Sequence, residues 1–157
     1  MAETLAEAAD ALGPDGGTPQ RSEEGGLVNS AEKKTGWDID RDGDIDLAVG
    51  GLSRVRLLRN DAPAPGSHWL SVRAVVGKRD ALGAEVVVVI GERRLRRLVH
   101  AAHSYASSSD PRAHFGLGVH DAVDAIEIRW PQGNRETFAV TAVDSEITLR
   151  RGEGVAW

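Results

Sequence analysis

The sequence predicts an all-β protein: an antiparallel β-sandwich preceded by a β-hairpin and a flexible N-terminal tail. Short β-branched or alternating runs, separated by turns, recur about every ten residues between residues 66 and 152. No helical period of useful length interrupts them. The stretch before them packs five aspartates into nine positions and then becomes an alternating apolar run.

The N-terminal segment, residues 1–34, is rich in Gly, Glu and Ala and contains "GPDGGTPQRSEEGG". Low hydrophobicity with clustered Gly, Pro and charge is typical of mobile chain, so we expect a flexible tail. The stretch "AETLAEAADAL" offers a short amphipathic helix as the alternative, with Leu5, Ala8 and Leu12 on one side.

Residues 35–60 are expected to form the hairpin, from the apolar runs "IDLAVGG" and "SRVRLLRN". Residues 61–152 are expected to form the β domain, and residues 153–157 its C-terminal end. The expected strands of this domain are "HWLSVRAVV", "AEVVVVIG", "RRLRRLVHA", "AIEIRW", "RETFAV" and "EITLRRG". A Gly-Glu turn joins the second and third of these strands, and "PQGN" turns the chain after the fourth.

Composition excludes several classes. The chain of 157 residues has a formal net charge of -5, which argues against nucleic acid as a partner. It has no cysteine, so disulfides and thiolate-ligated zinc are excluded. The start "MAETLAEAAD" lacks the basic residues and apolar run of a signal peptide, and no stretch reaches the roughly 18 apolar residues of a membrane span.

The aspartate loop, residues 38–46, has the spacing of a calcium site. Counting from Asp38, acidic side chains stand at positions 1, 3, 5, 7 and 9, with Gly43 at position 6. Calcium takes six to eight oxygen ligands, and alternate carboxylates on a turning loop can surround it. We expect side-chain ligands at positions 1, 3, 5 and 9 and a main-chain carbonyl at position 7. The predicted metal residues are Asp38, Asp40, Asp42, Asp44 and Asp46.

Two alternatives to a loop-and-strand calcium site are weaker. An EF-hand needs a glutamate at position 12, where this chain has Val49 in an alternating, strand-like run. Magnesium prefers fewer protein oxygens and more retained water. An aspartate-rich surface turn without metal stays open, because aspartate favours turns.

A basic run, "ERRLRRLVH", stands out in this acidic chain. We expect it to be a solvated strand, with a binding patch for an acidic glycan or an acidic protein as the sharper alternative. The candidate partner-binding residues are Arg93, Arg94, Arg96 and Arg97.

Catalytic residues are harder to find. "SSSDPRAH" places Ser, Asp and His within eight residues, but triads are assembled from distant segments and need an oxyanion hole. His100, His103 and His114 have no acidic pair nearby in the sequence and make a weak metal site. We therefore expect a non-catalytic protein, with an enzyme as the alternative.

Two family resemblances sharpen these expectations. "WDIDRDGDIDLAV" resembles the calcium loop of FG-GAP/VCBS repeats, the blades of integrin-like β-propellers. "RNDAPAPGSHWLSVRAVVGKRDALGAEVVVV", "SYASSSDPRAHFGLG" and "VDAIEIRWPQGNRETF" resemble the ASPIC/UnbV domain, which usually follows such repeats. The resemblance implies a secreted or otherwise extracytoplasmic module, and some family members accompany enediyne polyketide synthases.

We therefore expect a calcium-binding, non-catalytic β module for recognition, adhesion or scaffolding. The alternative is an accessory or catalytic protein of natural-product biosynthesis. A propeller needs several blades and only one loop of this kind is present, so either further blades are missing or the hairpin edge is covered, by the β domain or by another chain, such as a second copy.

Overall fold

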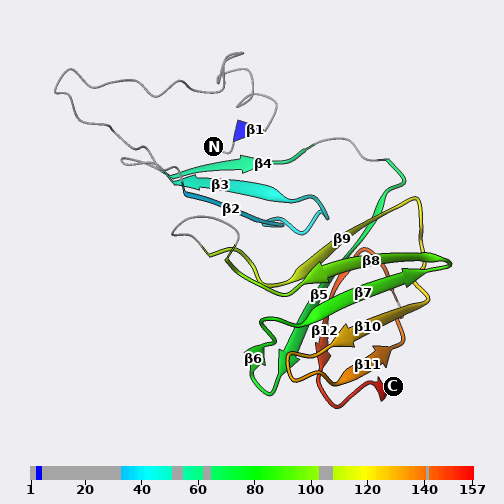
Figure 1. Ribbon diagram of the computed structural model, residues 1–157. Coiled ribbons are helices and arrows are strands. Elements are labelled where there is room, and N and C mark those ends of the chain that lie inside the picture. Colours follow the sequence, from blue (N-terminus) through cyan, green and yellow to red (C-terminus); the bar gives the residue numbers. More distant parts are fainter. Residues whose placement is uncertain (1–2, 5–32, 51–54, 62–64, 103–107, 141) are drawn as a thin grey trace, which may run out of the picture. The chain divides into compact units, whose positions relative to one another are not determined.

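The computed structural model describes residues 3–4, 33–50, 55–61, 65–102, 108–140 and 142–157 (Figure 1). No helix occurs in these ranges, which confirms the all-β prediction. The predicted flexible tail lies mostly outside them. No described segment is a helix long and apolar enough to cross a membrane. The chain divides into two compact units, Met1–Pro63 with Ala102–Ser109, and Ala64–Ala101 with Asp110–Trp157.

The first unit contains a small sheet in the order β1-β4-β3-β2. Its strands are β1 (Glu3–Thr4), β2 (Lys33–Trp37), β3 (Asp46–Gly50) and β4 (Val55–Arg59). The expected hairpin is present as the antiparallel pair β3–β4, and β2 adds antiparallel to the other edge of β3. β1 pairs parallel with β4. The aspartate loop therefore connects the hydrogen-bonded neighbours β2 and β3.

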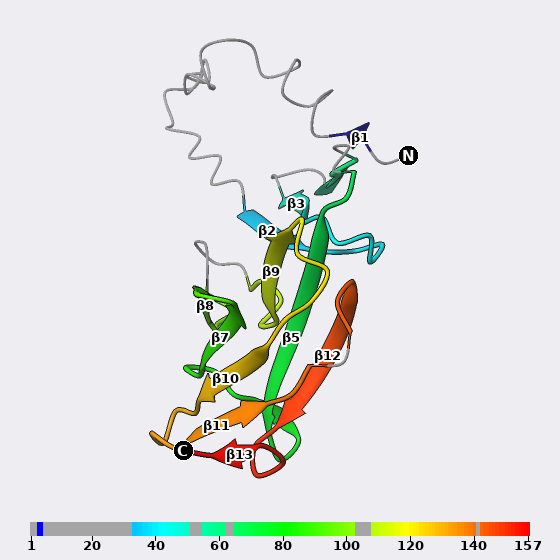
Figure 2. The same cartoon turned by 90° about the vertical axis from the view of Figure 1, so that its right-hand side faces the viewer.

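The second unit is a sandwich of two sheets. The β7 sheet has the order β13-β11-β10-β7-β8, and all its pairs are antiparallel. The β5 sheet has the order β12-β5-β6, with β9 also paired to β5. In Figure 2, β7 and β8 lie to the left of β5 and β12. The strands are β5 (His68–Val76), β6 (Arg79–Asp80), β7 (Glu85–Ile90), β8 (Arg93–Leu98), β9 (Ala113–Gly118), β10 (Ala125–Arg129), β11 (Arg135–Phe138), β12 (Ser145–Arg150) and β13 (Val155–Ala156).

Alternation along the strands builds the core of the second unit. Every second residue of each central strand points inward, and the two inner faces form one buried cluster. Its largest members are fully buried: Leu70, Phe115, Leu117, Ile126, Ile128 and Trp130. The outward residues of the β7 sheet are then set by register, and they form the second candidate site below.

One pairing departs from the antiparallel prediction, and one further strand lies outside the predicted β domain. β12 runs parallel to β5, from Ser145↔Leu70 to Arg150↔Val75. β13, within the C-terminal end, pairs with β11 and so belongs to the β7 sheet. The predicted turns are present: Gly91 (φ 55°) and Glu92 join β7 to β8, and Gly133 (φ 92°) lies in the turn after Trp130.

Candidate calcium loop and arginine groove

The aspartate loop is a tight turn between β2 and β3. The pair Trp37↔Asp46 closes the ladder beneath it. Within it, Arg41 (φ 64°) and Gly43 (φ 98°) adopt left-handed backbone, which curls the chain back on itself. The main-chain N–H of Gly43 donates to Asp38 Oδ2 at 3.1 Å. This curl brings alternate side chains of the loop to one centre.

Three carboxylates meet at that centre. Asp38, Asp40 and Asp42 each offer one oxygen, and these oxygens all lie within 4.8 Å of one another. Asp38 is only 7% exposed, while Asp40 and Asp42 are exposed. Oxygens bound to one calcium ion at 2.3–2.6 Å can stand at most about 5 Å apart, so this set fits the ion.

The other two predicted metal residues are placed differently. The main-chain N–H of Asp44 donates to Asp42 Oδ1 at 2.9 Å, so Asp44 contributes its main chain to the turn. Asp46 is fully buried, and its carboxylate accepts N–H groups from Ile39 at 2.9 Å and Asn60 at 2.8 Å. Asp46 therefore ties the start of the loop to the end of β4. The sequence carries no signal for the bond to Asn60, because this residue is 14 positions away along the chain.

A neighbouring arginine approaches the cluster from β4. Arg59 Nη1 lies 3.6 Å from Asp40 Oδ2, and its Nε lies 2.6 Å from Asp61 Oδ1. The hydrogen-bonded Asp61 carboxylate raises the pKa of the Arg59 guanidinium above its ordinary value, and Asp40 and Asp42 add to this rise. Arg59 is half exposed and shared with Asp61, so it offsets the charge of the cluster only in part.

The predicted basic run forms β8, an edge strand of the β7 sheet, and its four arginines are split between two faces. Arg94 and Arg96 stand opposite Val89 and Val87 on the outer face. Arg93 and Arg97 have the inward parity of Leu95, and they lie at the rim of the sandwich. Arg93 Nη1 is 3.0 Å from His120 Nε2, and the Arg97 guanidinium lies 5.9 Å from the Phe115 ring centre. The four therefore do not form one patch.

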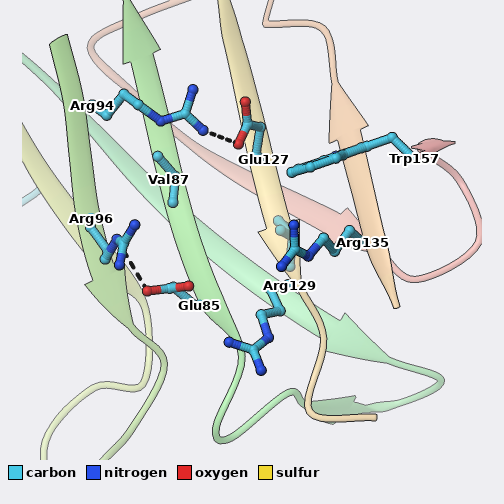
Figure 3. A pocket seen from close by; sticks show the side chains of 9 residues that line it. Glu85, Val87, Arg94, Arg96, Glu127, Arg129, Arg135 and Trp157 are labelled. Carbon is cyan, nitrogen blue, oxygen red and sulfur yellow. Dashed lines mark hydrogen bonds and ion pairs between the residues drawn. The ribbon is translucent and has the colours of Figure 1, made fainter. Parts of the chain in front are cut away.

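The outer face instead carries a groove of about 290 Å³, shown in Figure 3. We name it the arginine groove; its walls come from β7, β8, β10, β11 and the C-terminal end. The lining residues are Glu85, Val87, Arg94, Arg96, Glu127, Ile128, Arg129, Arg135 and Trp157. Only Arg94 and Arg96 were predicted from the sequence. Outward parity is a signal that could have revealed two of the others, because Glu127 and Arg129 alternate with buried Ile126 and Ile128.

Two residues of the possible triad motif "SSSDPRAH", Asp110 and His114, make contacts within the fold. Asp110 accepts hydrogen bonds from the main-chain N–H of Arg112 at 2.9 Å and from its Nε at 2.6 Å. His114 stacks on Trp69, with ring centres 5.8 Å apart. His103 lies outside the described residues.

Comparison with known proteins places the chain in a family. The family described as ASPIC and UnbV matches residues 75–156, more than half of the chain, and the chain belongs to it. Cartilage acidic protein 1 of Mus musculus is 31% identical over 147 residues, which cover 89% of this chain and 20% of that protein. The chain thus spans about a fifth of the length of this curated relative. Because so little of the chain lies outside the match, the aspartate loop falls within it.

Proposed function

We propose that the protein is a calcium-binding, non-catalytic β module for recognition, adhesion or scaffolding, acting outside the cytoplasm. The observation that carries the calcium part is the meeting of Asp38, Asp40 and Asp42 around one centre within 4.8 Å. Family membership and an all-β fold support a module of this kind. An extracytoplasmic location agrees with a relative named for cartilage and with a medium rich in calcium.

The loop residues would have different roles in calcium binding. Asp38, Asp40 and Asp42 would hold the ion, and the Asp44 carbonyl is the position-7 candidate. Asp46 holds the loop backbone in place by accepting hydrogen bonds from two main-chain N–H groups. The remaining lone pairs of its carboxylate oxygens are available to coordinate the ion. Bound calcium would neutralise carboxylates that otherwise repel one another, one of them buried, and so stabilise the loop between β2 and β3. This use of the loop is the one its FG-GAP/VCBS resemblance implies.

The test is calorimetric titration of the full chain with calcium, together with thermal unfolding. For a module with Kd of about 10⁻⁴ to 10⁻³ M, calcium at about 10 mM should stabilise the calcium-binding unit by roughly 1.4 to 2.7 kcal/mol. Magnesium at the same concentration should give less. Asp40→Asn should abolish most of the calcium effect, since Asp40 is an exposed member of the cluster.

The matched control is Asp121→Asn, an exposed aspartate of the other unit. It removes the same charge and should leave both the binding heat and the calcium shift unchanged. Absence of a binding heat from protein stripped of metal with a chelator, or equal shifts in the Asp40 variant and the wild type, would refute the calcium proposal.

A further inference from the structure

The arginine groove lies on the outer face of the β7 sheet, where strand pairing sets its residues in rows. One row across the sheet holds Glu85, Arg129 and Arg135. The strand register places Glu85 of β7 opposite Arg129 of β10, and Arg129 opposite Arg135 of β11. The next holds Arg96, Val87 and Glu127. Trp157 follows β13 and forms the far wall, and in Figure 3 its side chain reaches toward β10.

The charges of the groove are unevenly satisfied. Arg94 pairs with Glu127, and Arg96 Nε lies 3.1 Å from Glu85 Oε1. Arg129 and Arg135 stand directly opposite each other, and like charges in this position destabilise a sheet. Neither forms an ion pair with a carboxylate in the described part of the chain. Arg135 rests against the Trp157 ring, 5.0 Å from its centre. The groove thus has four arginines against two glutamates, in a chain of net charge -5.

We propose that this groove binds a saccharide that carries a carboxylate or sulfate group. The anionic group would lie between Arg129 and Arg135, whose guanidinium forks suit planar oxyanions. The exposed Trp157 indole offers an apolar face against which a sugar ring can pack. Glu85 and Glu127 can accept hydrogen bonds from sugar hydroxyls.

The glutamates decide between a saccharide and an acidic peptide. A peptide rich in Asp and Glu would gain from Arg129 and Arg135 but would meet Glu85 and Glu127 in the same groove. An anionic sugar presents one anionic group, which can bind the arginines, and several hydroxyl donors, which can bind the glutamates. The volume of about 290 Å³ stands at the lower end of small-molecule sites and fits a short stretch of oligosaccharide.

This inference rests on the recognition role proposed above and gives it a surface and a ligand class. It places recognition in the second unit, whereas the calcium proposal concerns the first. The two can therefore fail separately.

The test titrates the full chain with hyaluronan oligosaccharide (carboxylate only), chondroitin sulfate oligosaccharide (carboxylate and sulfate) and neutral dextran oligosaccharide, in calcium and in chelator. We expect at least one anionic probe to bind at least tenfold more tightly than dextran, and the comparison of the first two identifies the anion. Arg129→Gln and Arg135→Gln should each weaken binding about tenfold or more. Arg79→Gln, an exposed arginine of the β5 sheet, should leave binding unchanged.

Three results would overturn the proposal. The first is absence of binding by both anionic probes in either condition. The second is equal weakening by Arg79→Gln, which would mean general charge attraction. The third is tighter binding of polyglutamate than of the saccharides, lost in Arg129→Gln, which would make the groove an acidic-peptide surface. Circular dichroism of each variant verifies folding, and Arg129→Lys, which keeps the charge but not the planar fork, should bind with intermediate affinity.

Discussion

At the scale of the residue, the aspartate loop shows identical side chains in different roles. Asp46 is fully buried and holds main-chain N–H groups on both sides of it. Asp40 is exposed, and Arg59 Nη1 lies 3.6 Å from its Oδ2. A buried carboxylate that accepts two N–H groups stabilises the fold. An exposed carboxylate beside two others lowers stability unless a bound metal ion neutralises the cluster.

This difference predicts that substitution of the two aspartates by asparagine has different effects on stability when a chelator keeps the protein free of calcium. Asp46→Asn should lower the free energy of unfolding of the first unit by about 1–3 kcal/mol, because an amide NH₂ would face an N–H donor. Asp40→Asn should change it by less than about 0.5 kcal/mol or raise it slightly, because it relieves repulsion. Urea unfolding in chelator measures both. Equal losses in the two variants would contradict the separation of roles.

At the scale of the element, an ion-pair network joins the two strands that flank β5. Arg112, just before β9, pairs with Asp110 and with Glu146 of β12. Burial by itself would raise the pKa of the Asp110 carboxyl, but hydrogen bonds from the Arg112 side chain and main chain outweigh it and hold the pKa below its ordinary value. Because β9 and β12 lie on opposite edges of β5, the network reinforces pairing on both sides.

The lowered pKa gives a pH dependence with a definite sign. A carboxyl whose pKa is lower in the folded state contributes stability above its unfolded pKa, about 3.9, and loses that contribution as pH falls through the folded value. Asp110→Asn should therefore cost about 1–2 kcal/mol at neutral pH, and the gap from wild type should close below about pH 4.

The measurement is urea unfolding from pH 7 to pH 2.5, with Asp121→Asn as the control for removal of an exposed charge. A gap that stays constant down to the lowest pH would show that Asp110 acts through packing and not through its charge.

At the scale of the whole molecule, the division into two units has a physical basis. The second unit has a continuous core drawn from both sheets, from Leu70 to Phe138. The described part of the first unit buries few apolar side chains, among them Ala48 and Leu58, and it carries the aspartate loop. Stability in such a chain need not be uniform.

We therefore expect calcium to protect the first unit selectively. Hydrogen exchange followed by mass spectrometry should show slower exchange in calcium for peptides of residues 33–50, roughly in proportion to the 1.4 to 2.7 kcal/mol of binding. Peptides of residues 85–98 should exchange at the same rate with and without calcium. Equal protection of both regions would mean that calcium acts on the chain as a whole.

The sequence by itself determined the elements whose signal is local. Alternation in "AIEIRW" and the β-branched run "EVVVVI" predicted β10 and β7, because period-two burial follows from strand geometry alone. The spacing of Asp38, Asp40 and Asp42 predicted that their carboxylates meet. This signal is also local, since a short curled loop brings alternate residues to one centre.

Tertiary structure decided what depends on pairing between distant segments. The parallel pairing of β12 with β5, the bonds of Asp46 and the entry of β13 into the β7 sheet lie in this class. So does the arginine groove, in which Arg129, Arg135 and Trp157 meet only after β10, β11 and β13 have paired. Periodicity fixes the side of a strand on which a residue lies, but packing of the whole core selects the neighbour of that strand and therefore the composition of the surface.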